Sequence, residues 1–421
     1  MRNPEERIVV GLDIGTTKVC AIVASVDENE QINILGIGKA PSDGLNRGVV
    51  VNIDKTVNAI KSAIEQAQLA SGIEVKRVNV GIAGDHIRSM RSKGVITINN
   101  RDSEILQKDV DRILEDCQRI VLPADQQIIH VIPQEYVVDG QDGIIEPIGM
   151  SGIRMEANVH IITGLVSATK NLYRCVERAG YQVADLILEP LASSFAVLEE
   201  EEKEAGVVLV DIGGGTTDIA IFKGNTIRHT AVVAIAGQKV TDDITAGLKV
   251  LEDQAIKLKH QYGHTFADLI LEDEIITVPG IAGRPPKEIR KTTLASVIQA
   301  RMEEILEIVG IEINRSGYFN ELSAGIVITG GGSLLDGVAP LAQEILGMDA
   351  KIGFPRGLSG GLVNEVKSPI YSTGVGLVLH AIHTKSQPNS QLNTSGNSAK
   401  RDAGSIMQGI TNRMKDWFKE L

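Results

Sequence analysis

Apolar and polar residues follow one another along most of the chain in patterns that predict strands and helices in turn. Apolar runs bounded by turn residues predict strands at 8–13, 19–26, 31–39, 78–83, 207–211, 219–222 and 326–329. Apolar residues at helical spacing predict helices at 55–71, 168–179, 189–199, 292–315 and 371–383, the first of them capped by Asp54, and they indicate that residues 238–260 are largely helical. Strands that alternate with helices in this way indicate an α/β fold.

The pattern changes between residues 85 and 163. Short strands at 94–98, 128–132 and 159–162 surround a single helix at 103–120, and the earlier alternation resumes after them. We therefore expect a small α+β subdomain that is inserted into a larger α/β body.

A second change follows His383. Residues 385–404 are rich in Ser, Asn, Gln and Gly and almost free of apolar side chains, which is typical of a flexible linker. The final segment, 405–421, returns to helical spacing, with one apolar stripe made of Ile406, Met407, Ile410, Met414, Trp417, Phe418 and Leu421. Sixteen helical residues would extend for about 24 Å, which is too short to cross a bilayer of about 30 Å.

Such a helix can lie in the membrane interface, with Trp417 at the depth of the headgroups. Residues 400–421 contain five basic and three acidic side chains, so this segment has a net charge of +2. Residues 1–399 have a net charge of −14, which gives −12 for the whole chain. The local reversal favours an anionic membrane surface. The alternative is a helix that docks on the body of the protein or in a partner's groove.

The amino-acid composition limits the classes of protein to which the chain can belong. The 421 residues suffice for about two or three domains, and 43% apolar with 23% charged residues is ordinary for a globular protein. A net charge of −12 disfavours a nucleic-acid-binding role. Three widely separated cysteines without a CxxC pair fit a reducing cytosol, and neither a secretory leader nor a membrane-spanning run is expected.

Two similar glycine turns stand 198 positions apart, each between two apolar strands. The first contains Asp13, Gly15, Thr16, Thr17 and Lys18, and the second contains Asp211, Gly213, Gly214, Gly215, Thr216 and Thr217. Glycines let backbone N–H groups approach phosphate oxygens, while hydroxyls and a lysine add donors. The two aspartates at the strand ends can hold Mg²⁺, directly or through water.

A third glycine segment consists of Gly330, Gly331, Gly332 and Ser333, and it allows a flat ligand to lie against the backbone. Each segment alone is typical of an ordinary turn. Together, in this order, the three segments resemble the actin-like ATPase superfamily. The resemblance implies a two-lobed actin-like (ribonuclease-H-like) fold, with phosphates between the two turns and adenosine on the third segment. Residues 189–194 and 368–376 match the two connecting helices of that fold.

Within this superfamily the chain resembles the FtsA family of bacterial division proteins, through residues 11–18, 80–84, 189–194 and 283–286 and the terminal segment. The resemblance implies a first-lobe core of 1–84, 164–195 and 368–384. It also implies an inserted subdomain at 85–163, a second-lobe core of 196–236 and 300–367, and an outer subdomain at 237–299. The linker and the membrane-binding helix would complete the chain.

The same resemblance implies function. An FtsA-like protein would bind ATP and Mg, self-assemble, and anchor the FtsZ ring to the cytoplasmic face of the membrane at the division site, where it recruits later division proteins. The FtsZ C-terminal tail would dock on the outer subdomain, where Arg284, Lys287 and Arg290 offer opposite charge. Lys257 would contact the ribose, although Gln254 stands where related proteins often have glutamate.

Hydrolysis needs a group that orients the attacking water, and Glu189 is the best candidate in the sequence. Its alternative role is that of an acidic residue at a helix N-terminus. We expect at most slow ATP hydrolysis. Another actin-like filament protein and a small-molecule kinase remain as alternatives, although no further motif favours the kinase. The 38 residues after His383 are too few for the substrate domain of a 70-kDa chaperone.

Overall fold

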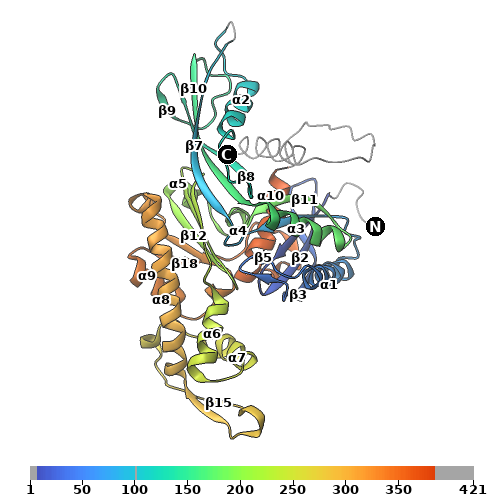
Figure 1. Cartoon of the computed structure of the whole chain (residues 1–421), viewed down its shortest axis with the longest axis vertical. Coiled ribbons are helices and arrows are strands. Elements are labelled where there is room, and N and C mark those ends of the chain that lie inside the picture. The colour runs from blue at the N-terminus through green and yellow to red at the C-terminus, as the bar shows by residue number, and fades with distance from the viewer. Residues whose placement is uncertain (1–6, 100–101, 385–421) are drawn as a thin grey trace.

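The computed structural model describes residues 7–99 and 102–384 (Figure 1). The expected linker and terminal helix, and with them Ile406, Trp417 and the rest of the apolar stripe, lie outside the described residues. Figure 1 shows an elongated molecule with two sheets at its centre and a smaller unit at each end of the long axis. The α/β fold expected from the sequence is confirmed.

The sheet of the first lobe has six strands in the order β11-β6-β1-β2-β3-β19. Their bounds are β1 Arg7–Ile14, β2 Lys18–Val26, β3 Ile32–Pro41, β6 Arg77–Ile82, β11 Gln182–Leu188 and β19 Gly360–Gly361. Strands β1, β2 and β3 form an antiparallel meander, and β6 runs parallel to β1. Helices α1 (Ile53–Ser71) and α3 (Val166–Arg178) pack together beside this sheet.

The sheet of the second lobe repeats this arrangement with five strands in the order β14-β13-β12-β17-β18. Their bounds are β12 Val207–Ile212, β13 Thr217–Lys223, β14 Thr226–Val233, β17 Ile326–Thr329 and β18 Ala350–Ile352. Again three strands form an antiparallel meander, and the fourth along the chain, β17, runs parallel to the first. Helices α8 (Lys291–Ser316) and α9 (Val338–Leu346) pack against each other in this lobe.

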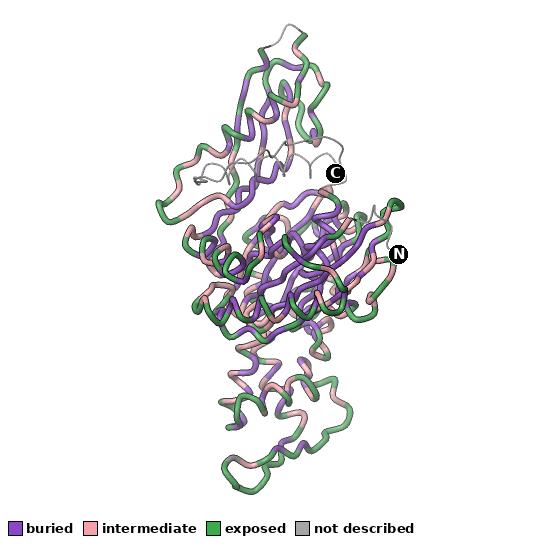
Figure 2. Tube along the Cα trace, turned by 90° about the vertical axis from the view of Figure 1, so that its right-hand side faces the viewer, coloured by how far each residue is buried: buried purple, intermediate pink, exposed green. Residues whose placement is uncertain are grey.

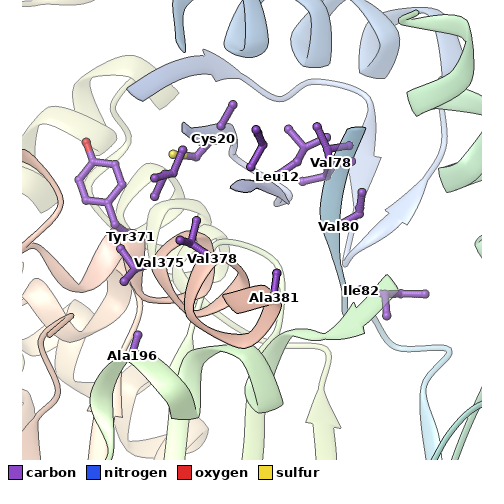
Figure 3. Packing of buried hydrophobic residues seen from close by; sticks show 14 of the residues in the cluster. Leu12, Cys20, Val78, Val80, Ile82, Ala196, Tyr371, Val375, Val378 and Ala381 are labelled. Atoms are coloured by element: carbon purple, nitrogen blue, oxygen red, sulfur yellow. The ribbon is translucent and has the colours of Figure 1, made fainter. Parts of the chain in front are cut away.

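Two helices, α4 (Glu189–Val197) and α10 (Ser372–His383), lie between the sheets and pack on each other. Almost every residue of α10 is buried, because apolar and small side chains surround the whole helix. Figure 3 shows Val375 and Val378 of α10 facing Leu12 and Cys20 of the first sheet. Figure 2 shows that the buried residues are concentrated in this central region. One apolar core therefore joins the two lobes.

The inserted segment forms a four-stranded antiparallel sheet in the order β7-β10-β8-β9, with its own apolar core. Its elements are β7 Arg88–Thr97, α2 Gln107–Cys117, β8 Gln126–Val138, β9 Gln141–Ile144 and β10 Arg154–Leu165. Helix α2 is shorter than the expected 103–120. Asp109 caps it by accepting a hydrogen bond from the N–H of Leu106 at 3.1 Å, and Glu104 pairs instead with Ser151 in a β-bridge.

The segment 238–260, expected to be largely helical, contains two helices, α6 (Gly237–Leu248) and α7 (Glu252–Tyr262). Lys249 ends α6 in the left-handed conformation, with φ of 51°. Gln254 then starts α7 by accepting a hydrogen bond from the N–H of Leu251 at 3.1 Å. A hairpin of β15 (Ile275–Val278) and β16 (Lys287–Arg290), which the sequence did not predict, projects beyond them (Figure 1).

Two helix ends also differ from expectation. Helix α1 is capped by Asn52, whose side chain accepts a hydrogen bond from the N–H of Lys55 at 3.0 Å, and Asp54 lies inside the first turn. The helix expected at 189–199 ends at Val197, and a short helix α5 (Glu200–Ala205) follows. The remaining short elements are β4 Leu45–Asn46, β5 Val49–Val50, η1 Ala267–Leu269, η2 Ile281–Gly283, η3 Phe319–Glu321, η4 Gly331–Leu334, η5 Val363–Glu365 and η6 Pro369–Tyr371. None of the helices in 7–99 and 102–384 has the length and apolar character needed to cross a membrane.

Candidate functional site

A cavity of about 730 Å³ lies between the two lobes, where the β1–β2 turn meets the β12–β13 turn. Most of the site residues expected from the sequence line it, namely Asp13, Gly15, Thr16, Thr17, Lys18, Glu189, Asp211, Gly213, Gly214, Gly215, Thr216, Gly330, Gly331 and Gly332. These residues come from strands, turns and a helix that are far apart in the sequence. The fold therefore brings the three glycine segments together in one cleft.

The two turns have the same internal geometry. The N–H of Gly15 donates to the carbonyl of Lys18 at 2.9 Å, and the N–H of Gly213 donates to the carbonyl of Thr216 at 3.0 Å. The turns also touch across the cleft, because a β-carbon on Gly215 would lie 2.9 Å from Cβ of Thr16. Only glycine at position 215 leaves room for this approach.

Four carboxyl groups converge on the cavity, from Asp13, Glu189, Asp211 and Asp218. Lys18 donates to Asp13 at 2.8 Å. Asp218, which the sequence analysis did not select, accepts a hydrogen bond from Thr216 at 3.0 Å through Oδ2, while its Oδ1 has no partner among the described residues. Its position directly after Thr217, as a second acidic residue beside the same glycine turn, is the sequence feature that indicates a role at the site.

The protonation of these groups reflects burial and mutual repulsion. Burial and then the charge of Asp211 raise the pKa of Asp218 to about 8, against the hydrogen bond from Thr216. Burial also raises the pKa of Asp211 to about 6, against the hydrogen bond from Ser193. Burial and then the charge of Asp13 hold the pKa of Glu189 well above its usual range. The site thus contains more acidic than basic groups, and a bound cation would reduce the repulsion between their charges.

The acidic residues suit a divalent cation that arrives with phosphates. Mg²⁺ is usually held by one or two carboxylates, several waters and phosphate oxygens, rather than by a complete protein cage. In keeping with this, the described residues contain no group of three or more His, Cys, Asp and Glu side chains placed to hold a metal by themselves. Asp13 and Asp211 lie at the ends of β1 and β12, where the two turns begin.

Three residues expected at the site do not line the cavity. Thr217 is fully buried and donates to the carbonyl of Ile235 at 2.8 Å. Ser333 donates to the carbonyl of Gly330 at 2.7 Å and so shapes the third glycine segment from within. Lys257 is exposed, because α7 turns Ile256, Lys259, His260 and Gln261 towards the cavity instead.

Lys259 is therefore the lysine of α7 at the cavity. Its ammonium group donates to the carbonyl of Gly237 at 2.9 Å and to the hydroxyl of Thr241 at 2.7 Å. Burial lowers the pKa of Lys259 to about 8. Gln254 faces elsewhere and donates to the carbonyl of Pro279 at 2.8 Å.

The three basic residues expected to bind a partner lie at or beside β16. Arg284 is exposed in the loop that precedes this strand. Lys287 donates to the carbonyl of Leu248 at 2.6 Å, and Arg290 approaches Asp273 at 3.5 Å. Two of the three cations thus already have internal partners.

A second groove, of about 510 Å³, lies in the same outer part of the second lobe, between α6 and α8. Val297 and Ala300 supply its apolar lining, and Arg301 stands beside them. Asp243 holds this guanidinium group through two contacts, of which the longer is 3.1 Å. The groove thus combines apolar surface with a fixed cation.

Known proteins resemble the chain over nearly its whole length. A cell division protein FtsA from Pseudomonas aeruginosa is 46% identical over 413 residues, which cover 98% of each chain. Another from Escherichia coli K12 is 37% identical over 427 residues, covering 100% of this chain and 99% of the relative. The family model described as cell division protein FtsA matches residues 208–376, and that of the SHS2 domain inserted in FtsA matches 84–163.

Solved structures show the same fold at low sequence identity. The PilM–PilN complex of type IV pilus biogenesis gives a TM-score of 0.65 at 16% identity, covering 89% of this chain and 98% of that chain. MreB5 of Spiroplasma citri gives 0.54 at 15% identity, covering 89% and 95%. The fold is therefore actin-like, with an inserted SHS2 domain. With relatives this similar over almost all of both chains, the protein belongs to the FtsA family of cell division proteins.

Proposed function

We propose that this chain binds ATP with Mg²⁺ between its lobes, self-assembles, and holds FtsZ at the cytoplasmic face of the cell membrane, where later division proteins join. The observation that carries the proposal is the meeting of two matching glycine turns around buried acidic groups in the 730 Å³ cavity. Such turns offer backbone N–H groups to phosphates from both sides. The membrane and partner roles rest on membership of the family and on the terminal segment.

In this proposal the phosphates lie between the two turns, and Lys18 adds a positive charge from the first. Asp13 and Asp211 hold the cation, directly or through water. Bound Mg²⁺ would neutralise part of the phosphate charge. The base and ribose lie towards Gly330 and α7, where Lys259, rather than Lys257, is the cation at the cavity.

Glu189 is the proposed residue that orients the attacking water. It starts α4 and lines the cavity, and a β-carbon on Gly81 would lie 2.9 Å from its Cγ. Burial and then the charge of Asp13 raise the pKa of Glu189 well above its usual range, so its carboxylate accepts a proton from water less readily than an exposed one would. This supports slow hydrolysis.

The proposed docking site for the FtsZ tail is the outer part of the second lobe. An acidic and apolar peptide would find opposite charge at Arg284, Lys287 and Arg290. The groove between α6 and α8 adds apolar surface at Val297 and Ala300. Because Lys287 and Arg290 have internal partners, Arg284 has the fewest contacts to give up when it binds.

One sedimentation experiment tests the proposal as a whole. Vesicles with anionic lipid are mixed with FtsZ and either the full chain or a chain ending at His383, with and without ATP. We expect the full chain to carry FtsZ into the pellet and the shortened chain to leave both in the supernatant. Equal sedimentation of the shortened chain would contradict the membrane role of 405–421. Loss of FtsZ from pellets that still contain the full chain would contradict the partner role.

A further inference from the structure

Asp13 and Asp211 occupy equivalent places in the two hairpins but have different partners. Asp13 forms an ion pair with Lys18 at 2.8 Å, so a cation of its own turn compensates its charge. Asp211 accepts hydrogen bonds through Oδ2 from the hydroxyls of Ser193 at 2.9 Å and Thr373 at 3.3 Å. Within 7–99 and 102–384 no lysine or arginine makes an ion pair with Asp211.

Hydroxyl donors orient a carboxylate without cancelling its charge. With Oδ2 held by two donors, the other oxygen, Oδ1, lies beside Gly330, which also lines the cavity. Of the two equivalent aspartates, Asp211 is thus the one without an ion pair among the described residues, and hydroxyls alone orient it.

The two hydroxyls come from the two helices between the lobes. Ser193 lies on α4 and Thr373 on α10, and their oxygens are 3.1 Å apart. Ser193 is fully buried and Thr373 is 8% exposed. The helices approach closely here, because a β-carbon on Gly376 would lie only 3.0 Å from the backbone nitrogen of Ser193 and would overlap the carbonyl of Ala192. Close packing leaves these side chains little freedom to rotate.

We propose that Ser193 and Thr373 are positioning residues, which hold the carboxylate of Asp211 in the orientation that meets the divalent cation accompanying the nucleotide. The inference rests on the proposed nucleotide site and deepens it. A carboxylate that is already oriented loses less rotational freedom when it binds a cation. The two hydroxyls therefore raise the affinity for the metal–nucleotide complex, and not for the nucleotide alone. Since each hydroxyl belongs to a different connecting helix, a shift of α4 against α10 would also disturb the cation site.

The chain contains a matched control one residue away. Ser194 is also buried, at 1% exposure, and its hydroxyl donates at 2.7 Å to the carbonyl of Leu191 in its own helix. Replacing either serine by alanine removes the same atom from the same helix. Only the change at 193 removes a contact with Asp211.

The test measures equilibrium binding of labelled ATP to the full chain, once with excess Mg²⁺ and once with EDTA. Each hydroxyl donates to a charged oxygen, so Ser193→Ala and Thr373→Val should each reduce the affinity measured with Mg²⁺ about tenfold. The affinity measured with EDTA should stay the same. Thr373→Ser keeps the hydroxyl and should bind like the unchanged chain, as should Ser194→Ala.

Several outcomes would overturn the inference. Equal losses with Mg²⁺ and with EDTA would indicate a general structural role, and so would a loss in Ser194→Ala as large as in Ser193→Ala. Should Ser193→Ala fail to fold, the comparison of Thr373→Val with Thr373→Ser decides alone. If the unchanged chain binds no ATP, the proposed function itself fails. If it binds ATP with help from Mg²⁺ and the variants do too, only the positioning role is excluded.

Discussion

Gly214 of the second lobe lies against Thr17 of the first, and a β-carbon added to Gly214 would be 2.7 Å from the Thr17 hydroxyl oxygen. The residues are almost two hundred positions apart and belong to the two matching turns. Their approach means that residues of both lobes bound the cavity. A side chain at position 214 would therefore obstruct the cleft.

We expect Gly214→Val to reduce ATP affinity at least tenfold, because the branched side chain needs the space that Thr17 and a phosphate would share. Equilibrium binding of labelled ATP measures this effect. Gly247→Ala is a suitable control, since a β-carbon there meets its nearest neighbour, in Val297, at an ordinary 3.5 Å. Unchanged affinity in Gly214→Val and in Asp211→Ala would mean that the turns are ordinary hairpins.

Charge reversal of Arg284, Lys287 and Arg290 together should weaken FtsZ binding several-fold, and more so at low salt, because exposed charges mainly steer association. Co-sedimentation with FtsZ over a range of salt concentrations measures this. Lys76→Glu, in the first lobe, reverses an exposed charge away from the outer part of the second lobe. If the triple variant binds FtsZ normally while Arg301→Glu does not, the tail docks in the groove between α6 and α8.

Trp417→Glu should move the full chain from the vesicle pellet to the supernatant and leave ATP binding unchanged. A buried charge opposes insertion of the apolar stripe, and one short helix binds weakly unless many act together in a filament. Trp417→Phe keeps an apolar ring and should still sediment. Persistent membrane association of a chain ending at His383 would instead favour attachment through a membrane-bound partner.

Gln134→Ala should destabilise the contact between the inserted subdomain and the second lobe. Gln134 is 4% exposed and donates to the carbonyls of Ile227 at 2.9 Å and Arg228 at 3.0 Å. Loss of the amide leaves buried acceptors unsatisfied, which costs roughly 1–3 kcal/mol. Urea unfolding measures the change, with Gln141→Ala on the exposed strand β9 as control. Equal stabilities of the two variants would contradict a structural role for this contact.

Buried histidines should make the protein sensitive to mild acid. Burial lowers the pKa of His130 and of His380 to about 4 and that of His160 to about 3. Between about pH 6.5 and 4 these histidines therefore bind more protons in the unfolded chain than in the folded one, so their contribution to stability falls as the pH falls, whereas the raised pKa values of Asp211 and Asp218 act in the opposite direction. Each histidine adds up to about 1.4 kcal/mol per pH unit to this slope.

His380→Leu should remove one such contribution. Urea midpoints between pH 7 and 5 would show a shallower loss of stability than in the unchanged chain. His264→Leu serves as control, because His264 is only half-buried and lies outside the central core. A slope that His380→Leu leaves unchanged would mean that other groups cause the acid sensitivity.

Local sequence signals determined much of this protein. The glycine turns could be found because close approach of two backbones requires glycine at specific positions, and residues 13–18 and 213–216, with Asp211, proved to line one cavity. Helical periodicity predicted α8 and α10 correctly, because the order of apolar and polar side chains shows whether one face of a helix or the whole helix is buried.

Long-range contacts were decided only in the folded chain. No local pattern indicates that Ser193 and Thr373 meet at Asp211, because 180 residues separate the two hydroxyls and only the crossing of α4 and α10 joins them. Lys259 replaces Lys257 at the cavity for a similar reason, since the rotation of α7 about its axis is set by what it packs against. Sequence periodicity specifies which residues share a face, and tertiary packing decides what that face meets.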